Sequence, residues 1–364
     1  MALTGNKGEW SEIYTLIKLL GDGKVYAGDA NLKKLTVFYQ ILSIIRQENE
    51  QYEYKPDSTR QIVIIDKNGN QFARIPMSKF IHEAKDLLSA IKNGKQSTFS
   101  IPSTEAFMNT IGCTKLKAPS KDKADIHIVI HDSQTEMAHL LGFSIKSQLG
   151  KRSTLINPGR TTNIVYRIEN KNMTDATMNH VNNMNNGDKM DLIGRVRWLK
   201  NNGCRLIYDH FENDVLKNNM MMVDTILPDI IQRMLLFFYE TDARTVNDLL
   251  KEVEQENFMN FDLSQYPLFY QRKVANLLVD AALGMVPKTK WHGKYDATGG
   301  YLIVKEDGDI LCYHFYNRNL FEDYLLNNTD FTTPGKHEQN NFGIVYKQNN
   351  HYYMNLELQV RFLQ

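Results

Sequence analysis

Residues 125–148, DIHIVIHDSQTEMAHLLGFSIKSQ, determine the fold of the region around them. Apolar and polar residues alternate in both halves of this stretch, which predicts two strands that each bury one face. The alternating apolar residues are Ile126, Ile128 and Ile130 in the first half, and Leu141, Phe143 and Ile145 in the second. If DSQTE at residues 132–136 forms the turn, the two strands make an antiparallel hairpin.

The register of this hairpin brings four polar residues to one face. Symmetry about the middle of the turn places Asp125 opposite Ser144, and opposed residues of an antiparallel pair point to the same side. Lys146 and Gln148 follow Ser144 at a spacing of two and share that side. A carboxylate can hold a divalent metal, and an ammonium can orient water and stabilise charge on a phosphate. We therefore predict a hydrolytic site at Asp125 and Lys146, with Ser144 and Gln148 hydrogen-bonding water or phosphate.

The hairpin resembles the core of PD-(D/E)XK nucleases, in which an aspartate and a D/E-x-K tripeptide on adjacent strands bind magnesium and cleave phosphodiesters. The resemblance implies an α/β (α+β) fold with a mixed sheet flanked by helices. We expect Asp125 and the carbonyl of Ile145 to bind Mg²⁺. Two positions depart from the pattern: Ala124 replaces the usual proline, and Ser144 replaces the usual acidic residue. The second departure matters more, because Mg²⁺ prefers carboxylate and other oxygen ligands.

A candidate for the missing carboxylate lies near the N-terminus, in GNKGEWSEIYTLIKLLGDGK at residues 5–24. Apolar residues three and four apart predict an amphipathic helix, and Gly21 and Gly23 supply its end. Glu9 and Glu12 are three apart and share a face. Related nucleases often place a glutamate of the first helix beside the metal, so we expect Glu9 or Glu12 to join Asp125. The alternative is that both glutamates only compensate the helix dipole.

Beyond this core, the chain resembles the HpaII-type type II restriction endonucleases. The matching blocks occur in order along nearly the whole chain: GNKGEWSEIYTLIKLLGDGKVYAGD, GFSIKSQLGKRSTLIN, TGGYLIVKEDGDILCYHFYNRNLFEDYLLNNT and LELQVRF. The resemblance implies Mg²⁺-dependent cleavage of double-stranded DNA at CCGG, in a functional pair with a cognate cytosine methyltransferase. We expect 5′-phosphate ends. A palindromic site favours a homodimer, and cleavage as a monomer is the alternative.

Basic and polar residues follow the second strand, in GKRSTLINPGRTTN at residues 150–163. The net charge of the chain is only +1, but local charge governs DNA binding. Arginine pairs specifically with guanine, whereas serine, threonine and asparagine hold phosphates or base edges. The alternative is an ordinary solvated loop. With two lysines of the KWHGK block, the predicted DNA-binding residues are Lys151, Arg152, Ser153, Thr154, Asn157, Arg160, Thr161, Thr162, Asn163, Lys290 and Lys294.

The amino-acid composition limits the class of protein and the compartment in which we expect it. The chain has 364 residues, of which 42% are hydrophobic and 23% charged, as in ordinary globular proteins. Its three cysteines are far apart and lack the spacing of zinc sites, which predicts buried thiols in a reducing compartment. No apolar run approaches 18 residues and the N-terminus turns polar at once, so we expect no signal peptide and a cytoplasmic protein without a membrane partner.

The order of predicted elements suggests two regions. Strands at 34–45 and 61–75 and helices at 77–92 and 103–111 precede the hairpin, and a strand at 163–168 follows it. Later segments predict helices at 189–201, 223–240, 246–256 and 270–283, and then strands from Gly299 onward. Polar residues 178–189 form the best linker. We therefore expect a nuclease core at 1–183 and a helical and C-terminal β region at 184–364 that completes a DNA cleft, with a single domain as the alternative.

Three functions fit these features. The first is a site-specific restriction endonuclease. The second is a structure-specific nuclease, such as a junction resolvase or repair nuclease, and the third is an inactive DNA-binding relative. A resolvase core needs little beyond the hairpin and first helix, yet more than half of this chain follows Lys146. An inactive relative would be expected to lose Asp125 or Lys146, and both are present. These features favour the restriction endonuclease.

Overall fold

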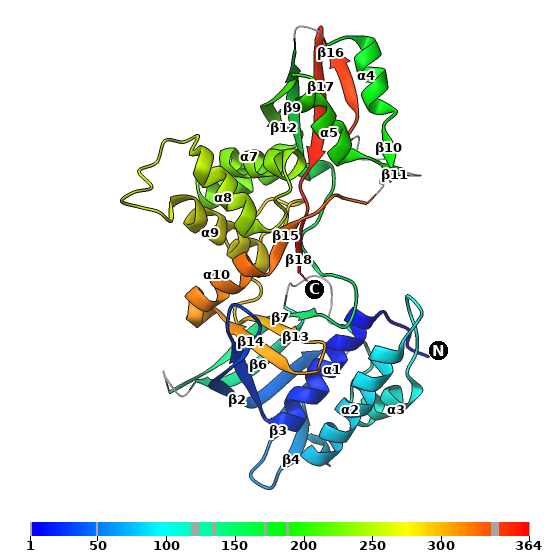
Figure 1. Ribbon diagram of the computed structural model, residues 1–364. Helices are drawn as coiled ribbons and strands as arrows, with labels where there is room; N and C mark the ends of the chain where they lie inside the picture. Colours follow the sequence, from blue (N-terminus) through cyan, green and yellow to red (C-terminus); the bar gives the residue numbers. More distant parts are fainter. Residues whose placement is uncertain are drawn as a thin grey trace. The chain divides into compact units, whose positions relative to one another are not determined.

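A computed structural model describes residues 2–48, 50–117, 124–132, 136–170, 173–186, 189–335 and 342–363. The chain forms two compact units, which Figure 1 colours by position along the sequence. Unit 1 contains Met1–Ser153, Tyr295–Tyr324 and Gln364, and unit 2 contains Thr154–Lys294 and Leu325–Leu363. Each unit therefore combines segments that are distant in sequence, and the division expected between residues 183 and 184 falls inside unit 2.

Unit 1 is built on a mixed nine-stranded sheet. β7 pairs in parallel with β13 and β1 in parallel with β14, whereas the other neighbours are antiparallel. The strand order is β1 (Lys24–Gly28), β14 (Ile310–His314), β13 (Gly300–Val304), β7 (Met137–Ser147), β6 (Ile126–Asp132), β2 (Lys34–Gln47), β3 (Gln51–Pro56), β4 (Gln61–Asp66) and β5 (Gln71–Pro76). The predicted mixed α/β class is confirmed.

The β6–β7 hairpin has the predicted register. Ile126 pairs with Phe143, and continuing the ladder by one residue places Asp125 opposite Ser144. The Asp125 N–H donates to the carbonyl of Phe143 at 2.8 Å. Phe143 is fully buried, and the alternating isoleucines are buried in the same core. The middle of the expected turn, residues 133–135, lies outside the described residues.

Among the described residues, three helices lie wholly in unit 1, namely α1 (Lys7–Asp22), α2 (Met77–Asn93) and α3 (Pro102–Thr110), and α10 (Arg318–Asn327) begins there. The apolar side of α1 packs against the sheet with α2 beside it, and Trp10, Ile13 and Ile17 are fully buried there (Figure 1). The helix starts at a capping box formed by Asn6 and Glu9 and ends at Gly23, whose φ of 67° favours glycine. The predicted amphipathic helix and its glycine stop are confirmed.

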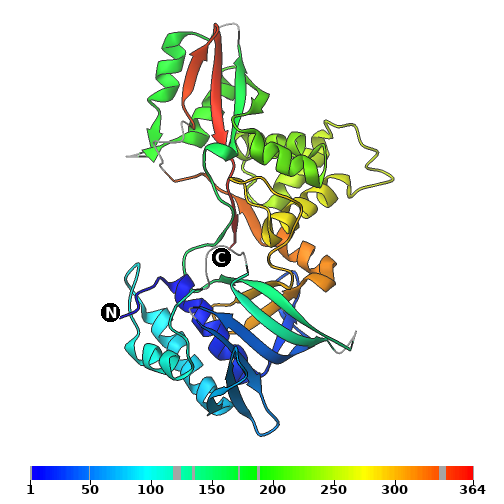
Figure 2. The same cartoon turned by 180° about the vertical axis from the view of Figure 1, so that it is seen from behind.

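Unit 2 contains the smaller sheets and most of the helices (Figure 2). The four-stranded sheet has the order β12 (Arg205–Phe211), β9 (Asn163–Glu169), β17 (His351–Glu357) and β16 (Val345–Gln348). The three-stranded sheet has the order β15 (Thr329–Phe331), β18 (Val360–Phe362) and β8 (Thr154–Ile156), and a short pair joins β10 (Asn185–Asn186) to β11 (Lys189–Met190). The helices are α4 (Asp175–Asn182), α5 (Leu192–Asn201), α6 (Asp214–Val223), α7 (Leu227–Glu240), α8 (Val246–Glu256) and α9 (Phe269–Leu283).

The expected helices of the later region are present, with Pro228 in the first turn of α7. The expected linker at 178–189 is different: its first residues belong to α4, which the Thr174 side chain caps. Residues 185 and 186 form β10, and residues 187 and 188 lie outside the described residues. The segment is rich in asparagine, which is common in turns, so its composition indicated a linker and not a helix.

Two further expectations concern the whole chain. The three cysteines are unbridged and buried, as predicted. Among the described residues, no helix combines the length and the apolar character needed to cross a membrane.

The buried face of the hairpin predicts a clear difference between two substitutions on β7. Phe143→Ala removes a fully buried ring and should cost about 3 to 5 kcal/mol of unfolding free energy. Leu140→Ala changes a side chain that is 52% exposed and should change it by no more than about 0.5 kcal/mol. Urea denaturation of the two variants measures this difference, and equal midpoints would contradict the assigned core face.

Candidate active site

Asp125 is fixed by the neighbouring strand. Its Oδ2 accepts a hydrogen bond from the N–H of Ile145 at 2.6 Å and another from the Ser144 hydroxyl at 3.1 Å. Ser144 is only 3% exposed, so the hydroxyl lies beneath the carboxylate and is removed from solvent. The serine at the position of the usual acidic residue therefore supports Asp125 through a hydrogen bond.

Lys146 lies two residues beyond Ser144 on the same side of β7. Its Nζ is 5.1 Å from the centre of the Tyr301 ring, which comes from the parallel neighbour β13. Burial lowers the pKa of Lys146, while the charges of Asp125 and Glu12 raise it in part. Tyr301 in turn packs edge-on against Phe321 of α10 (Arg318–Asn327), with ring centres 5.4 Å apart. The aromatic pair thus fixes one side of the ammonium.

A cleft of about 340 Å³ joins these groups to the first turns of α1. Its lining residues are Asn6, Gly8, Glu9, Glu12, Lys117, Asp125, Ile145, Lys146, Ser147, Gly150, Lys151 and Ser153. The side chain of Ile145 packs in the core, so its main chain borders the cleft. Residues from the two ends of the predicted site therefore meet at one place within unit 1.

The two glutamates of α1 have different partners. Glu9 accepts the Asn6 N–H at 2.9 Å in the capping box and the Lys117 ammonium at 3.1 Å. Although burial raises its pKa, these two donors hold the pKa of Glu9 below the ordinary value. Glu12 is half-buried, lines the cleft and acts electrostatically on Lys146. Of the two, Glu12 is better placed to join Asp125.

The donor set of this cleft suits a hard divalent cation. Asp125 and Glu12 provide carboxylate oxygens, and the main chain of Ile145 provides a carbonyl. Within the described parts of the chain, no three or more histidine, cysteine, aspartate or glutamate side chains form a metal-binding group. Such a sparse set fits Mg²⁺, which keeps several waters and shares its remaining positions with substrate phosphate.

Gln148 does not join the other predicted catalytic residues. β7 ends at Ser147, so the alternation that sequence spacing implied stops one residue before Gln148. The Gln148 N–H donates to the Val304 carbonyl at 2.9 Å, and its side chain is not among those that line the cleft. The structure thus brings together Asp125, Ser144 and Lys146 and leaves Gln148 outside.

The predicted DNA-binding residues divide between the two units. Lys151 and Ser153 line the cleft of unit 1, and half-buried Arg152 lies between them in sequence. Thr154 begins β8 of unit 2. Five of the others are exposed or half-exposed in unit 2: Asn157, Arg160, Thr161, Lys290 and Lys294. The stretch expected to be one loop is therefore partly a strand and a short 3₁₀ turn.

Thr162 and Asn163 are both 0% exposed, which corrects their expected placement on a DNA-binding surface. The Thr162 hydroxyl donates to the carbonyl of Gly159 at 2.9 Å, and Asn163 donates to Glu212 at 2.7 Å. The cause is that Asn163 begins β9 in the middle of a sheet. The side chains of Thr162 and Asn163 thus stabilise the fold around the start of β9 through buried hydrogen bonds.

Sequence spacing missed two residues of these sites. Tyr301 has no distinctive spacing in the sequence, and its place beside Lys146 depends on the parallel pairing of β13 with β7. Glu212 follows β12, a strand that was not predicted, and it meets Arg160 only in the folded chain. No local pattern marks either contact.

Comparisons with known proteins place the chain among enzymes that cut DNA at specific sites. Residues 6–362 match the family model described as HpaII restriction endonuclease, and the chain belongs to this family. It is 41% identical over 362 residues to the Type II restriction enzyme HpaII of Haemophilus parainfluenzae, covering 99% of each chain. No solved structure gives a significant match. The protein is thus a type II site-specific deoxyribonuclease, a class that generally uses divalent metal ions.

The bond from Ser144 to Asp125 predicts a partial loss of activity in Ser144→Ala. A hydrogen bond to a charged group contributes roughly 1.5 to 3 kcal/mol, so the cleavage rate should fall about ten- to a hundredfold. Single-turnover DNA cleavage measures the rate, and the circular dichroism spectrum should match that of the wild type. A Ser144→Ala enzyme that cuts at the full rate would show that the hydroxyl does not support Asp125.

Proposed function

We propose that this endonuclease hydrolyses double-stranded DNA at CCGG, with Mg²⁺ as its metal ion, and leaves 5′-phosphate ends. The observation that carries the proposal is the single cleft in which Asp125, Glu12, Ile145 and Lys146 meet. The arrangement supports a PD-(D/E)XK type of site in which α1 supplies the carboxylate that the tripeptide lacks. The CCGG sequence rests on the membership of the HpaII family.

Asp125, Glu12 and the carbonyl of Ile145 would hold the Mg²⁺ ion. The ion, when bound, supplies positive charge that polarises the scissile phosphate. The Ser144 hydroxyl and the Ile145 N–H hold one oxygen of Asp125 in place, so the carboxylate needs little reorganisation to bind a cation. Glu9 stays with the capping box and with Lys117.

Lys146 orients the attacking water and stabilises negative charge on the phosphate. Its ammonium is confined between the Tyr301 ring and the charges of Asp125 and Glu12, so its position is defined before DNA binds. A buried cation stabilises developing charge more strongly than one in water, because the local dielectric constant is lower. Lys151 and Ser153, which line the same cleft, hold neighbouring phosphate oxygens.

In unit 2, the exposed cations Arg160, Lys290 and Lys294 bind DNA, with Arg160 on a base edge and the lysines on phosphates. A CCGG site has twofold symmetry, which suits a homodimer that presents one cleft to each strand. A cognate cytosine methyltransferase modifies the same sequence.

The proposed role of Lys146 predicts the behaviour of two variants. Lys146→Ala and Asp125→Ala should each lower the cleavage of a sequenced plasmid by at least about a hundredfold, because each removes a group that acts on the reacting phosphate. Binding to a CCGG duplex should stay close to that of the wild type for Lys146→Ala. Digestion with Mg²⁺ present or withheld gives the cut positions and the metal requirement, and undiminished cutting by either variant removes this cleft from consideration.

A matched pair of substitutions on α1 separates the two glutamates. Glu12→Gln should reduce cleavage on the order of a hundredfold, because it removes one of the two carboxylates of the metal site. Glu9→Gln keeps the capping box, which glutamine also forms, and should retain most of the activity. The same single-turnover assay, repeated across Mg²⁺ concentrations, compares the two. The opposite order of effects would assign the metal to Glu9.

A further inference from the structure

Glu212 is the centre of a hydrogen-bonded cluster in unit 2. Its Oε1 accepts from the Nε of Arg160 at 3.2 Å and from the Nη2 at 3.1 Å. Its Oε2 accepts from the amide of Asn163 at 2.7 Å and from the amide of Asn355 at 3.2 Å. A carboxylate has about four lone-pair positions, so these four donors fix both of its oxygens.

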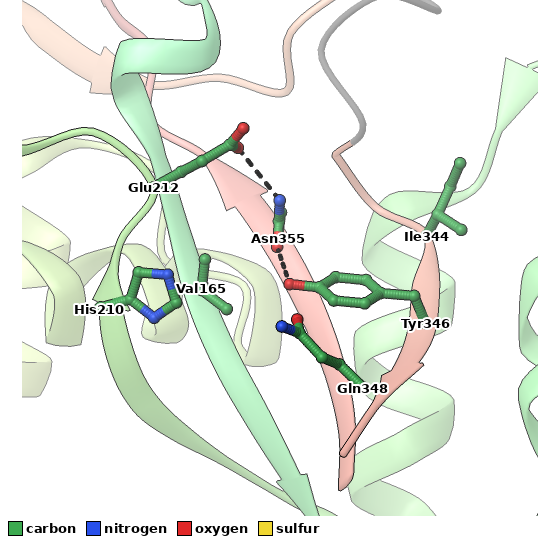
Figure 3. A pocket seen from close by; sticks show the side chains of 7 residues that line it. All are labelled: Val165, His210, Glu212, Ile344, Tyr346, Gln348 and Asn355. Carbon is green, nitrogen blue, oxygen red and sulfur yellow. Dashed lines mark hydrogen bonds between the residues drawn. The ribbon is translucent and has the colours of Figure 1, made fainter. Parts of the chain in front are cut away.

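The side chains that hydrogen-bond Glu212 Oε2, those of Asn163 and Asn355, are buried. Asn163 is 0% exposed and Asn355 only 6%, and Asn355 in turn accepts the hydroxyl of Tyr346 at 3.1 Å (Figure 3). Exposed Arg–Glu pairs contribute little to stability, and buried amides are tolerated only where they are satisfied. The two buried amides hold the Glu212 carboxylate in place, so Glu212 can in turn fix a group that bonds to it.

The group held in place is the guanidinium of Arg160. The Arg160 side chain is 64% exposed, whereas that of Glu212 is only 23% exposed. Two of the five N–H groups of the guanidinium bond Glu212, so three are not used by that carboxylate. Two parallel N–H groups of an arginine match O6 and N7 of guanine in the major groove.

Two clefts adjoin the cluster. A cleft of about 490 Å³ adjoins Glu212 and is lined by His210, Tyr346, Gln348 and Asn355 among others (Figure 3). On another side, Glu212 and Lys290 line a second cleft of about 440 Å³. Buried Asn219 bonds the main chain at Thr289 and Trp291 and so fixes the segment that carries Lys290. A cation suited to phosphate thus lines a cleft that also borders Glu212, the partner of Arg160.

From these contacts we infer that Glu212 is a positioning residue for sequence recognition, which holds Arg160 so that its guanidinium pairs with one guanine of the recognition sequence. The inference rests on the proposed function and adds to it the source of specificity at one G·C pair. A fixed arginine loses less side-chain entropy on binding than a mobile one, so the carboxylate raises the affinity for guanine over other bases.

The test is equilibrium binding of the full-length enzyme to short duplexes in buffer with chelator and no metal. The duplexes carry the preferred site and each single-base variant of it, and the preferred site is first selected from randomised duplexes with the wild-type enzyme. Glu212→Gln should lower discrimination roughly tenfold at one G·C pair and leave the other positions unchanged. Arg160→Ala should lower discrimination at the same pair, and adding Glu212→Gln to it should have no further effect.

A matched control comes from the same sheet. Glu169 of β9 accepts from Arg205 of β12 at 3.1 Å and from Arg167 at 2.6 Å, so Glu169→Gln weakens comparable surface ion pairs without touching the cluster. The Glu169→Gln variant should discriminate between the preferred duplex and its single-base variants to within about twofold of the wild type. If Glu212→Gln fails to fold, Arg160→Lys keeps the charge at an exposed position and should still lose the preference, because lysine lacks the bidentate geometry.

Several outcomes would overturn the inference. Full discrimination by Glu212→Gln or by Arg160→Lys would show that the pair does not recognise a base. Equal weakening on all duplexes by the same variants would make the cluster a phosphate clamp. A wild-type preference for a site other than CCGG would refute the proposed sequence alone, and the inference would then be judged on the guanines of the selected site.

Discussion

The proposed active-site cleft depends on one interaction, the hydrogen bonding of Asp125 to the strand beside it. The N–H of Ile145 and the hydroxyl of Ser144 both donate to the same carboxylate oxygen, so the register of the β6–β7 hairpin directly sets the position of the acid. A slip of one residue would turn Ser144 and Lys146 toward the core and Phe143 toward the cleft. The buried face of the hairpin opposes that slip, and the packing of the core therefore maintains the geometry of the proposed catalytic groups.

The sequence was sufficient for the parts of this site that depend on local spacing. Alternation of apolar residues gave the hairpin, its core face and the pairing of Asp125 with Ser144, all of which the structure confirms. Helical spacing gave α1, and the structure brings Glu12 of that helix to the cleft. The choice between Glu9 and Glu12 needed the structure, because both share a helix face and only the folded chain shows that Lys117 engages Glu9.

Contacts between distant segments were not predictable in this way. Tyr301 reaches Lys146 because β13 pairs in parallel with β7, and no turn or spacing in the chain encodes that pairing. Glu212 lies close in sequence to Arg160 by comparison, but the unpredicted strand β12 brings the two together. The units themselves also mix early and late segments, so a linear division cannot describe them. Pairing of distant strands costs loop-closure entropy, and the packing of the complete core offsets that cost. Local sequence patterns therefore do not indicate which distant strands pair.

We expect one metal ion to bind among Asp125, Glu12 and the carbonyl of Ile145. Anomalous scattering from Mn²⁺ in crystals of the enzyme with a CCGG duplex locates the ion without reference to activity. An anomalous peak should lie within coordination distance of an Asp125 carboxylate oxygen and of the Ile145 carbonyl. A peak bound only by other residues, with none in this cleft, would exclude this metal site.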